Sequence, residues 1–299
     1  MEELSGVLIV NKSAGMTSHD VVNRIRRIYN TKRVGHTGTL DPMATGVLVV
    51  LVGRAAKAAE YLGADTKRYR ATLRLGLTTD TEDTTGTVLT ACEDIPEEGE
   101  VMETVSRFVG RIKQIPPMYS ALKVDGKKLC DLARRGEVIE REARDIEIFS
   151  LDCRTLSQRE YLLDIHASSG TYVRTLCADI GAALGCGGAM ATLERRACGD
   201  FKIEDSHTLD ALTELSYADA AALLLPVESL FSELDEVKLP DFYARLASSG
   251  CEIYQKKIGT DFPVGDRVRM YDKNGFFALG EVREYENGTA VKAIKLFVI

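Results

Sequence analysis

A short loop with three glycines and a proline constrains this chain more than any other stretch. It is the segment RVGHTGTLDPMATG at residues 33–46, followed by the apolar run VLVVLV at 47–52. Glycine tolerates positive φ, and proline fixes its own φ and moves the preceding residue away from the helical region. The residue before the proline is Asp41. The pattern predicts a carboxylate on a loop with a constrained backbone, next to a strand that is buried on both faces.

Two interpretations of this loop follow from its residues. An Asp before Pro is ordinary turn chemistry, and on these residues alone a structural turn is the simpler interpretation. Reactive side chains also often lie on constrained loops that a rigid strand holds in place. The sequence of residues 35–48, GHTGTLDPMATGVL, closely resembles the catalytic motif of the TruB family of tRNA pseudouridine synthases. The resemblance implies that Asp41 converts the uridine at tRNA position 55 to pseudouridine, and that His36 fills the space that the base leaves in the T-loop.

The charge distribution agrees with an RNA substrate although the net charge is -7. Residues 80–103 and 204–236 each hold nine acidic and no basic residues, so the rest of the chain carries a net charge of +11. The remaining surface can therefore present patches that bind phosphate, while the acidic stretches face elsewhere. A basic remainder is equally compatible with two acidic faces that are merely solvated.

Composition excludes several other classes of protein. The 299 residues suffice for one large domain, or for a large and a small one, and 45% of them are hydrophobic. No apolar run approaches the roughly 20 residues of a membrane span, and the start of the chain lacks a basic signal-peptide region; we expect a cytoplasmic protein. The seven cysteines are scattered and there are four histidines, so neither a disulfide framework nor a metal site is expected.

The first segment extends the resemblance. Residues 5–10 predict a strand, and Thr17 or Ser18 can cap a helix whose apolar residues recur at helical spacing up to Tyr29. The family has the motif Lys-Pro-x-Gly-x-Thr-Ser here. This chain keeps the lysine, Lys12, but has Ser13 in place of the proline. We expect Lys12 to support substrate binding and to take no part in catalysis.

The alternating run KRYRATLRL at residues 67–75 predicts a strand with arginines on one face. A tyrosine on such a strand is most often a core residue. The Lys-Arg-Tyr-Arg sequence, however, matches the family's second motif, which implies that Tyr69 stacks on the target base and takes part in proton transfer.

The later motifs follow in the family's order. Residues 114–128 contain the family's Pro-x-Met-Tyr-Ser-Ala-Leu-Lys segment and an Asp125-Gly126 hairpin signal in a basic region. The sequence GTYVRT at 170–175 resembles the motif whose arginine pairs with the catalytic aspartate, which implies that Arg174 pairs with Asp41 and that Tyr172 contacts substrate. Leu193 matches a leucine of the uracil pocket. A paired guanidinium favours the ionised carboxylate.

The resemblance and the element pattern together predict an α+β fold. We expect a mixed, largely antiparallel sheet of the pseudouridine synthase fold, flanked by helices, over residues 1–235. Residues 236–299 change to short strands and turns, with a hairpin signal at Asn274-Gly275. They resemble a PUA domain, a small β-barrel that binds RNA.

Conversion of uridine to pseudouridine breaks the N1–C1′ bond and rejoins the turned base through C5, so no atoms or electrons are exchanged. We therefore expect no cofactor and no metal. An aspartate carboxylate can add to the base or sugar and later depart. The target base must leave the RNA stack, and an aromatic side chain can receive it.

Three alternatives remain open. The chain could be a non-catalytic protein that binds or folds tRNA, against which the intact Asp41, Tyr69 and Arg174 argue. It could be a guide-RNA-dependent synthase like the archaeal and eukaryotic relatives, although the insert at residues 76–110 and the small C-terminal domain favour the stand-alone bacterial type. A glycoside hydrolase would need a second positioned carboxylate, and none is evident. We expect a monomer that binds the T-arm of tRNA, with no obligatory protein partner and no membrane contact.

Overall fold

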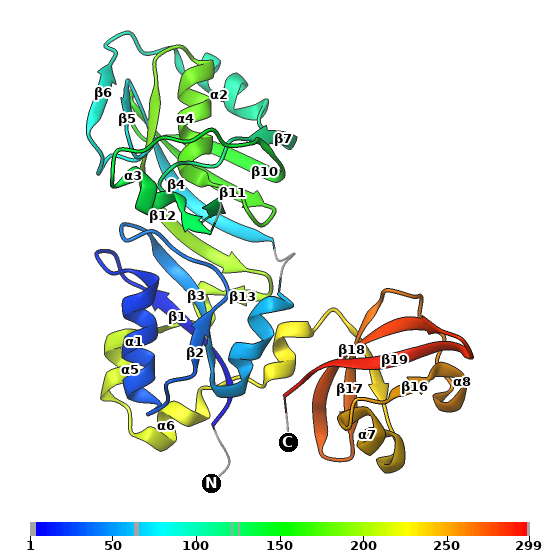
Figure 1. The fold of residues 1–299 in the computed structure, drawn as a ribbon. Helices are drawn as coiled ribbons and strands as arrows, with labels where there is room; N and C mark the ends of the chain where they lie inside the picture. The colour runs from blue at the N-terminus through cyan, green and yellow to red at the C-terminus, as the bar shows by residue number, and fades with distance from the viewer. Residues whose placement is uncertain (1–3, 63–65, 121, 125, 298–299) are drawn as a thin grey trace.

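The structure is a computed structural model that describes residues 4–62, 66–120, 122–124 and 126–297. Its main feature is a ten-stranded sheet built from strands between residues 6 and 208, with a separate five-stranded sheet at the side (Figure 1). The large sheet has the order β14-β1-β3-β12-β4-β11-β10-β7, with β2 on β3 and β13 on β12. Only the pairs β1–β14 and β3–β12 are parallel within this described sheet. The predicted mixed sheet is confirmed.

One end of the large sheet carries the glycine-rich loop. The strands β1 and β3 pair along their whole lengths in antiparallel register, and β2 continues beside β3. Helix α1 lies against this end, with Thr17 as its N-cap and Asp20 completing a capping box. The elements of this end are β1 (Gly6–Lys12), α1 (Ser18–Ile28), β2 (Val34–His36), β3 (Thr45–Val52) and the 3-10 helix η1 (Gly53–Glu60).

The other end of the sheet is covered on one face by two helices, α2 and α4. Apolar side chains of β4, β11 and α4 meet there in one core, which includes Leu73, Leu163 and Leu176. The long strand β12 reaches from this end to β3 and so joins the two ends. The elements are β4 (Lys67–Leu75), β5 (Leu77–Thr79), β6 (Val88–Ala91), α2 (Glu98–Ser106), β7 (Gly110–Gln114), β10 (Arg144–Thr155), β11 (Glu160–Ala167), α4 (Val173–Ala183) and β12 (Gly188–Cys198).

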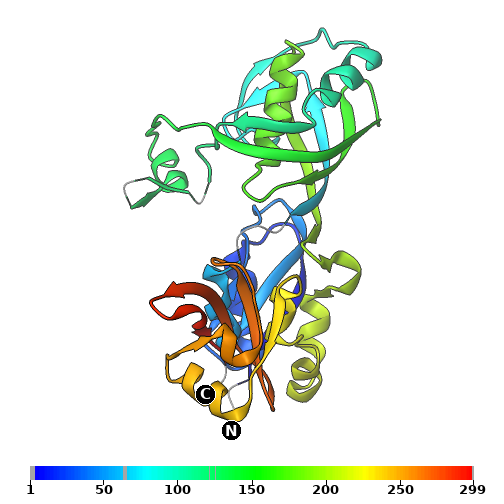
Figure 2. The ribbon, with the colours of Figure 1, turned by 90° about the vertical axis from the view of Figure 1, so that its right-hand side faces the viewer.

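A segment between β7 and β10 projects away from the body (Figure 2). It contains the short strands β8 (Lys123–Val124) and β9 (Lys127–Lys128) and the helix α3 (Leu129–Ala133). The two strands pair in antiparallel fashion, as the hairpin signal predicted. Asp125, the first residue of that signal, lies outside the described residues.

A connector leads from β12 to the second sheet. It consists of short elements on either side of Pro226. One of them, β14, adds a parallel strand to β1, so this acidic stretch completes the edge of the large sheet. The elements are β13 (Phe201–Lys202), η2 (Ile203–Asp205), β14 (His207–Thr208), α5 (Leu209–Glu214), α6 (Tyr217–Ala222) and η3 (Val227–Phe231).

The second sheet has the order β15-β17-β18-β19-β16, so β15 and β16 are its two edges among the described residues. It has a core of its own, and a further apolar cluster joins Phe276 and Phe297 of this part to Phe231 and the strands β1 and β3. The elements are β15 (Asp235–Lys238), α7 (Asp241–Ser248), β16 (Glu252–Tyr254), α8 (Gln255–Ile258), β17 (Arg267–Asp272), β18 (Gly275–Tyr285) and β19 (Gly288–Leu296).

Within the described parts of the chain, no helix is both long and apolar enough to cross a membrane.

Candidate active site

The loop that carries Asp41 links β2 to β3 and is held by side chains from the start of the chain. Lys12, whose side chain is fully buried, donates from Nζ to the carbonyl of Pro42 at 3.2 Å and to the carbonyls of Ser13 and Met16 at 3.0 and 2.8 Å. The hydroxyl of Ser18 donates to the Leu40 carbonyl at 3.1 Å and accepts from the Leu40 amide at 2.9 Å. These bonds fix the backbone on both sides of Asp41 and leave its carboxylate free to face outward.

Burial of Lys12 has an electrostatic consequence. It lowers the pKa of the ammonium from 10.5 to about 8, although the nearby Asp41 carboxylate acts in the opposite direction. The lysine is therefore a cation at neutral pH that contacts backbone oxygens and lies close to Asp41.

Arg174 reaches Asp41 from the first turn of α4. Its Nε lies 2.9 Å from Asp41 Oδ2; the Arg174 side chain is 5% exposed and that of Asp41 is 36% exposed. The guanidinium also donates to the carbonyls of Thr81 at 2.8 Å and Tyr119 at 2.7 Å. One face of the carboxylate is thus paired, and the rest is open to a substrate.

A second carboxylate, which the sequence analysis did not single out, lies behind Arg174. Asp83 Oδ2 is 4.0 Å from Arg174 Nη1, and Asp83 is buried. Its other oxygen accepts from the Thr85 amide at 2.9 Å. The preceding residue, Glu82, has a φ of 64°, which is unusual for a residue with a side chain. This turn brings Asp83 toward Arg174. The sequence Asp-Thr-Glu-Asp-Thr-Thr-Gly at residues 80–86 predicts a turn, but it does not indicate which of its carboxylates faces Arg174.

Glu82 itself is tied to α4. It accepts a hydrogen bond from the Thr175 hydroxyl at 2.6 Å. Burial raises the pKa of its carboxyl, with the Thr175 hydrogen bond and Arg174 acting in the opposite direction. Thr175, the residue after Arg174, therefore holds the turn that contains Thr81 and Asp83, and Arg174 contacts both of these residues.

Tyr69 lies in β4, in the middle of the sheet, and is 8% exposed. Its register partner on β12 is Arg195. Burial raises the pKa of the Tyr69 phenol, and the charge and hydrogen bonding of Arg195 act in the opposite direction. Leu193 lies two residues before Arg195 on the same strand, opposite Ala71 of β4, and is also buried.

The other two expected residues lie at the ends of elements. His36 ends β2; burial lowers its pKa, which favours the neutral imidazole at pH 7, and its Nδ1 is buried without a partner among the described atoms. Tyr172 is the N-cap of α4, where the buried side chain of Gln114 accepts from its amide at 2.8 Å and donates to its carbonyl at 3.1 Å. Gln114 therefore supports the start of the helix that carries Arg174.

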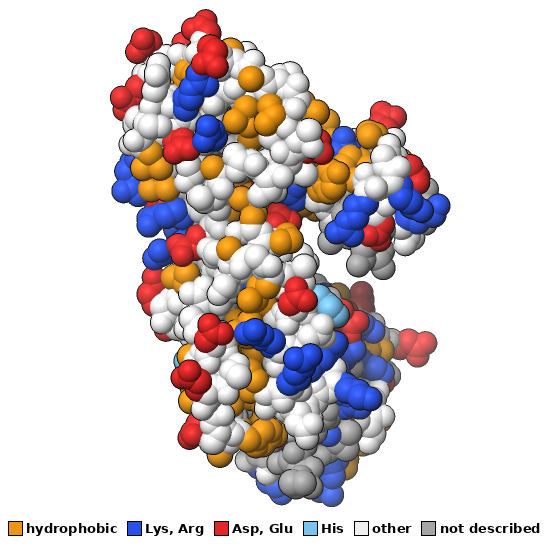
Figure 3. All heavy atoms as spheres, turned by 90° about the vertical axis from the view of Figure 1, so that its left-hand side faces the viewer, with side chains coloured by type: hydrophobic (Ala, Val, Ile, Leu, Met, Phe, Trp, Pro, Cys, Tyr) orange, Lys and Arg blue, Asp and Glu red, His pale blue; other side chains and the backbone are white. Residues whose placement is uncertain are grey.

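Basic side chains lie on two parts of one face of the molecule. Figure 3 shows them on the projecting segment and on the body that contains α1, on either side of a recess. Such an arrangement suits a phosphate backbone.

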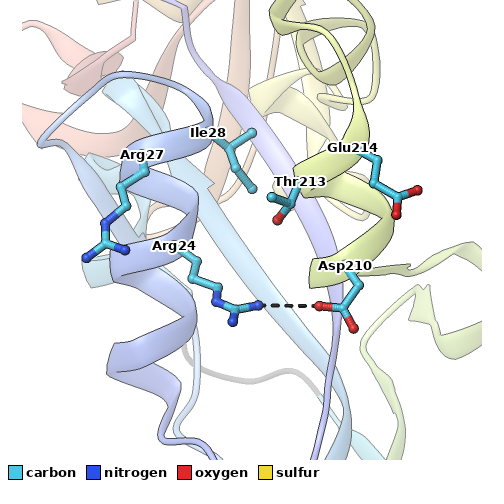
Figure 4. A pocket seen from close by; sticks show the side chains of 6 residues that line it. All are labelled: Arg24, Arg27, Ile28, Asp210, Thr213 and Glu214. Atoms are coloured by element: carbon cyan, nitrogen blue, oxygen red, sulfur yellow. Dashed lines mark hydrogen bonds and ion pairs between the residues drawn. The ribbon is translucent and has the colours of Figure 1, made fainter.

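Two other hollows contain none of the expected site residues. One of about 480 Å³ lies between α1 and α5, where Arg24 and Asp210 approach to 3.4 Å (Figure 4). Another, of about 420 Å³, is lined by side chains that include Asp200, Asp205 and His207. In the described parts of the chain, no three His, Cys, Asp or Glu side chains gather as a metal site.

Comparisons with known proteins identify the family. A family model described as "TruB family pseudouridylate synthase (N terminal domain)" matches residues 26–173, and one described as "tRNA pseudouridylate synthase B C-terminal domain" matches residues 174–232. The chain is 40% identical to the tRNA pseudouridine synthase B of Alkaliphilus oremlandii, with 98% of each chain covered, and 38% identical to that of Clostridium tetani, with 99% and 100% covered.

Solved structures give the same picture of the fold. A chain in "Crystal Structure of a Cbf5-Nop10-Gar1 Complex" is 27% identical, with a TM-score of 0.74, over 98% of this chain and 85% of that one. A chain in "Crystal structure of the archaeal box H/ACA sRNP Nop10-Cbf5 complex" is 25% identical, with a TM-score of 0.71, over 98% and 86%. The fold is that of the pseudouridine synthases. Within that class, the chain belongs to the TruB family of pseudouridylate synthases.

Proposed function

We propose that the protein isomerises the uridine at position 55, in the T-loop of tRNA, to pseudouridine, with Asp41 as the nucleophile. The observation that carries this proposal is the contact between Asp41 and Arg174: an accessible carboxylate lies 2.9 Å from a guanidinium that is almost fully buried. The guanidinium lies against one side of the carboxylate and restricts its rotation, and a carboxylate nucleophile has to be held in place in this way.

The substrate base leaves its stack at a cost of roughly a few kcal/mol. Stacking on Tyr69 offsets this by about 1–3 kcal/mol. The Asp41 carboxylate adds to the base or the sugar, the N1–C1′ bond breaks, and the turned base bonds to C1′ through C5. The bond to Asp41 breaks again, and N1 takes up a proton from water. The proton on C5 then leaves to Tyr69 or to a water molecule, and its electron pair returns to the ring. No cofactor takes part in this scheme.

Four further residues support substrate binding in this proposal, three of them by direct contact. His36, neutral because it is buried, fills the space that the base leaves in the T-loop. Leu193 contacts the uracil ring, and Tyr172 contacts the RNA next to Arg174. Lys12 acts through the loop, because its contacts are with backbone carbonyls.

The proposed domains are a catalytic domain at residues 1–235 and a PUA-like, barrel-forming RNA-binding domain at 236–299. The family matches end at residue 232, and the strands after this point form a sheet of their own with their own core. This division supports a domain boundary near residue 235. We propose that the protein is a monomer and modifies tRNA in the cytoplasm.

A guide-RNA-dependent reaction is the second candidate, because the similar solved structures are complexes of Cbf5 with partner proteins. The relatives named tRNA pseudouridine synthase B are more similar, at 40% and 38% identity against 27% and 25%, and match over 98% and 100% of their own length. We therefore favour a synthase that acts without a guide RNA or a protein partner.

Tritium release distinguishes these candidates. The purified protein alone is incubated with a tRNA transcript that contains uridine tritiated at C5. We expect release of about one equivalent per tRNA, and none from a transcript with cytidine at position 55. Release that requires an added guide RNA or protein would favour the second candidate. Binding of tRNA without any release would contradict both.

A further inference from the structure

The charge balance around Asp41 includes a cation that the proposed chemistry does not use. Arg195, on β12, is 2% exposed and is the largest of the fully buried side chains. No carboxylate in the described parts of the chain forms an ion pair with it. A buried charge without a counter-ion is costly unless hydrogen bonds satisfy it. The contacts of this guanidinium therefore need a specific explanation.

Its hydrogen bonds go to the two ends of the Asp41 loop. Nη2 donates to the carbonyl of Gly38 at 2.9 Å, and Nε donates to the carbonyl of Val47 at 2.7 Å. Gly38 comes three residues before Asp41, and Val47 opens the apolar run of β3. A planar guanidinium can hold two such acceptors at a fixed separation, which an ammonium group cannot do as well. Arg195 thus links the start of the loop to β3.

The backbone of β12 also comes very close to this loop. Gly46 pairs with Arg195 in parallel register, and a Cβ atom on Gly46 would collide with the Arg195 carbonyl oxygen. Gly46 has a φ of 97°, which favours glycine. The loop can therefore return to β3 only because this position has no side chain, and Arg195 occupies the point of closest approach.

The same residue is paired with Tyr69 across β4 and β12. Side chains of directly opposed residues start within about 4.5–5.5 Å of each other at Cβ. The effect of Arg195 on the phenol, which opposes the effect of burial, agrees with a guanidinium beside the phenolic oxygen. One buried side chain thus contacts the loop that carries Asp41 and faces the group assigned to proton transfer.

We propose that Arg195 is a positioning residue that holds the Asp41 loop and the Tyr69 phenol at a fixed separation and presents its positive charge to the phenolic oxygen. This inference rests on the proposed function. The charge favours the ionised phenol, which can take the proton from C5: the C5–H bond breaks, an O–H bond forms, and the electron pair returns to the ring. The phenol then loses this proton to water.

The test measures single-turnover tritium release against pH with saturating enzyme, together with the dissociation constant for tRNA. The variants are Arg195→Gln, which removes the charge, and Arg195→Lys, which keeps it. Arg196→Gln is the matched control, because the adjacent Arg196 is partly exposed and pairs with Glu194 and Glu204.

We expect Arg195→Gln to lower the rate at pH 7 by about 100-fold or more, which is typical for the loss of a proton-transfer contribution. Ionised phenol becomes more abundant as the pH rises, so the deficit should shrink toward high pH. Arg195→Lys should recover part of the rate and keep the pH profile close to that of the wild type. The dissociation constant should change less than about threefold, and Arg196→Gln should match the wild type.

Three results would overturn the inference: a rate close to wild type in Arg195→Gln, an equal loss at every pH, or a loss in Arg195→Lys as large as in Arg195→Gln. If Arg195→Gln does not fold, a double-mutant cycle decides. The loss of rate from Arg195→Lys should be smaller in a Tyr69→Phe background than in the wild type, because Arg195 acts through the phenol, and equal losses in both backgrounds would overturn the inference. A wild-type protein without activity would contradict the proposed function instead, so the two failures are distinguishable.

Discussion

The two sides of Asp41 are built in different ways. On one side, Lys12 and Ser18 contact the backbone of the loop at Pro42 and Leu40. On the other side, Arg174 contacts the carboxylate itself, and it comes from 133 positions further along the chain. The first side determines where the carboxylate lies, and the second determines how it is oriented. We therefore expect substitutions of Lys12 or Ser18 to affect mainly the position of the loop, and substitution of Arg174 to affect mainly the reactivity of the Asp41 carboxylate.

Loss of Arg174 should have the largest effect. We expect Arg174→Met to lower the rate constant for tritium release by roughly 100-fold or more, because a misplaced reacting group costs at least that much. The substitution also leaves buried carbonyls and Asp83 without their partner, so the free energy of unfolding should fall by about 3–5 kcal/mol. Rate assays and urea denaturation measure the two effects. A rate close to wild type would mean that the carboxylate does not need Arg174.

Loss of the loop's lysine should act on stability more than on chemistry. In Lys12→Met three backbone carbonyls lose a donor, and we expect a loss of about 1–3 kcal/mol at pH 7. The pKa of Lys12 is lowered to about 8 in the folded state. Between pH 8 and 10.5 the unfolded chain therefore binds more protons at this residue, and the wild type gains stability as the pH rises.

The stability difference between the wild type and Lys12→Met should therefore widen over that pH range. Denaturation at pH 7.5, 9 and 10 measures it, and the comparison cancels groups that titrate in both proteins. A difference that stays constant or narrows would contradict the burial of a charged lysine.

A smaller change on the same side is Ser18→Ala. It removes the two hydrogen bonds to Leu40, so the free energy of unfolding should fall by about 1 kcal/mol. The rate should stay within a few-fold of the wild type, since Lys12 still holds the loop. A loss of activity as large as that of Arg174→Met would show that the two sides cannot be separated.

The smallest effect is expected further along α1. Arg24 pairs with Asp210 at the surface, with side chains that are 50% and 93% exposed. Exposed ion pairs contribute about 0–1 kcal/mol, so Arg24→Ala should change neither stability nor the rate measurably. This variant calibrates the others, and a large loss of tRNA affinity would instead identify this face as an RNA contact.

Local patterns predicted much of the fold. The strand at residues 67–75 and the helix that Thr17 caps follow from alternation, spacing and capping. The strand at 160–167 has the same alternation, with Tyr161, Leu163 and Ile165 buried. Helix α2 ends at Ser106, because the chain then enters β7 at Gly110. Pairing with a distant strand decides such boundaries, and a local pattern does not contain it.

The site shows the same limit more clearly. Asp41 and Arg174 were singled out by resemblance, and nothing in the spacing of two residues so far apart predicts their contact. Asp83, Gln114 and Arg195 were not singled out at all. Each is buried and polar, and its role comes from what lies opposite it in the fold: the guanidinium of Arg174, the backbone of Tyr172 and the ends of the Asp41 loop.

The central claim is that the Asp41 carboxylate performs the chemistry, and the most direct test is tritium release by Asp41→Asn. The amide is nearly isosteric but cannot act as a carboxylate nucleophile, so we predict a rate at least about 10⁴-fold below that of the wild type. Affinity for tRNA and the thermal midpoint should stay close to the wild-type values. Release at a wild-type rate by this variant would contradict the account, because another group would then have to be the nucleophile.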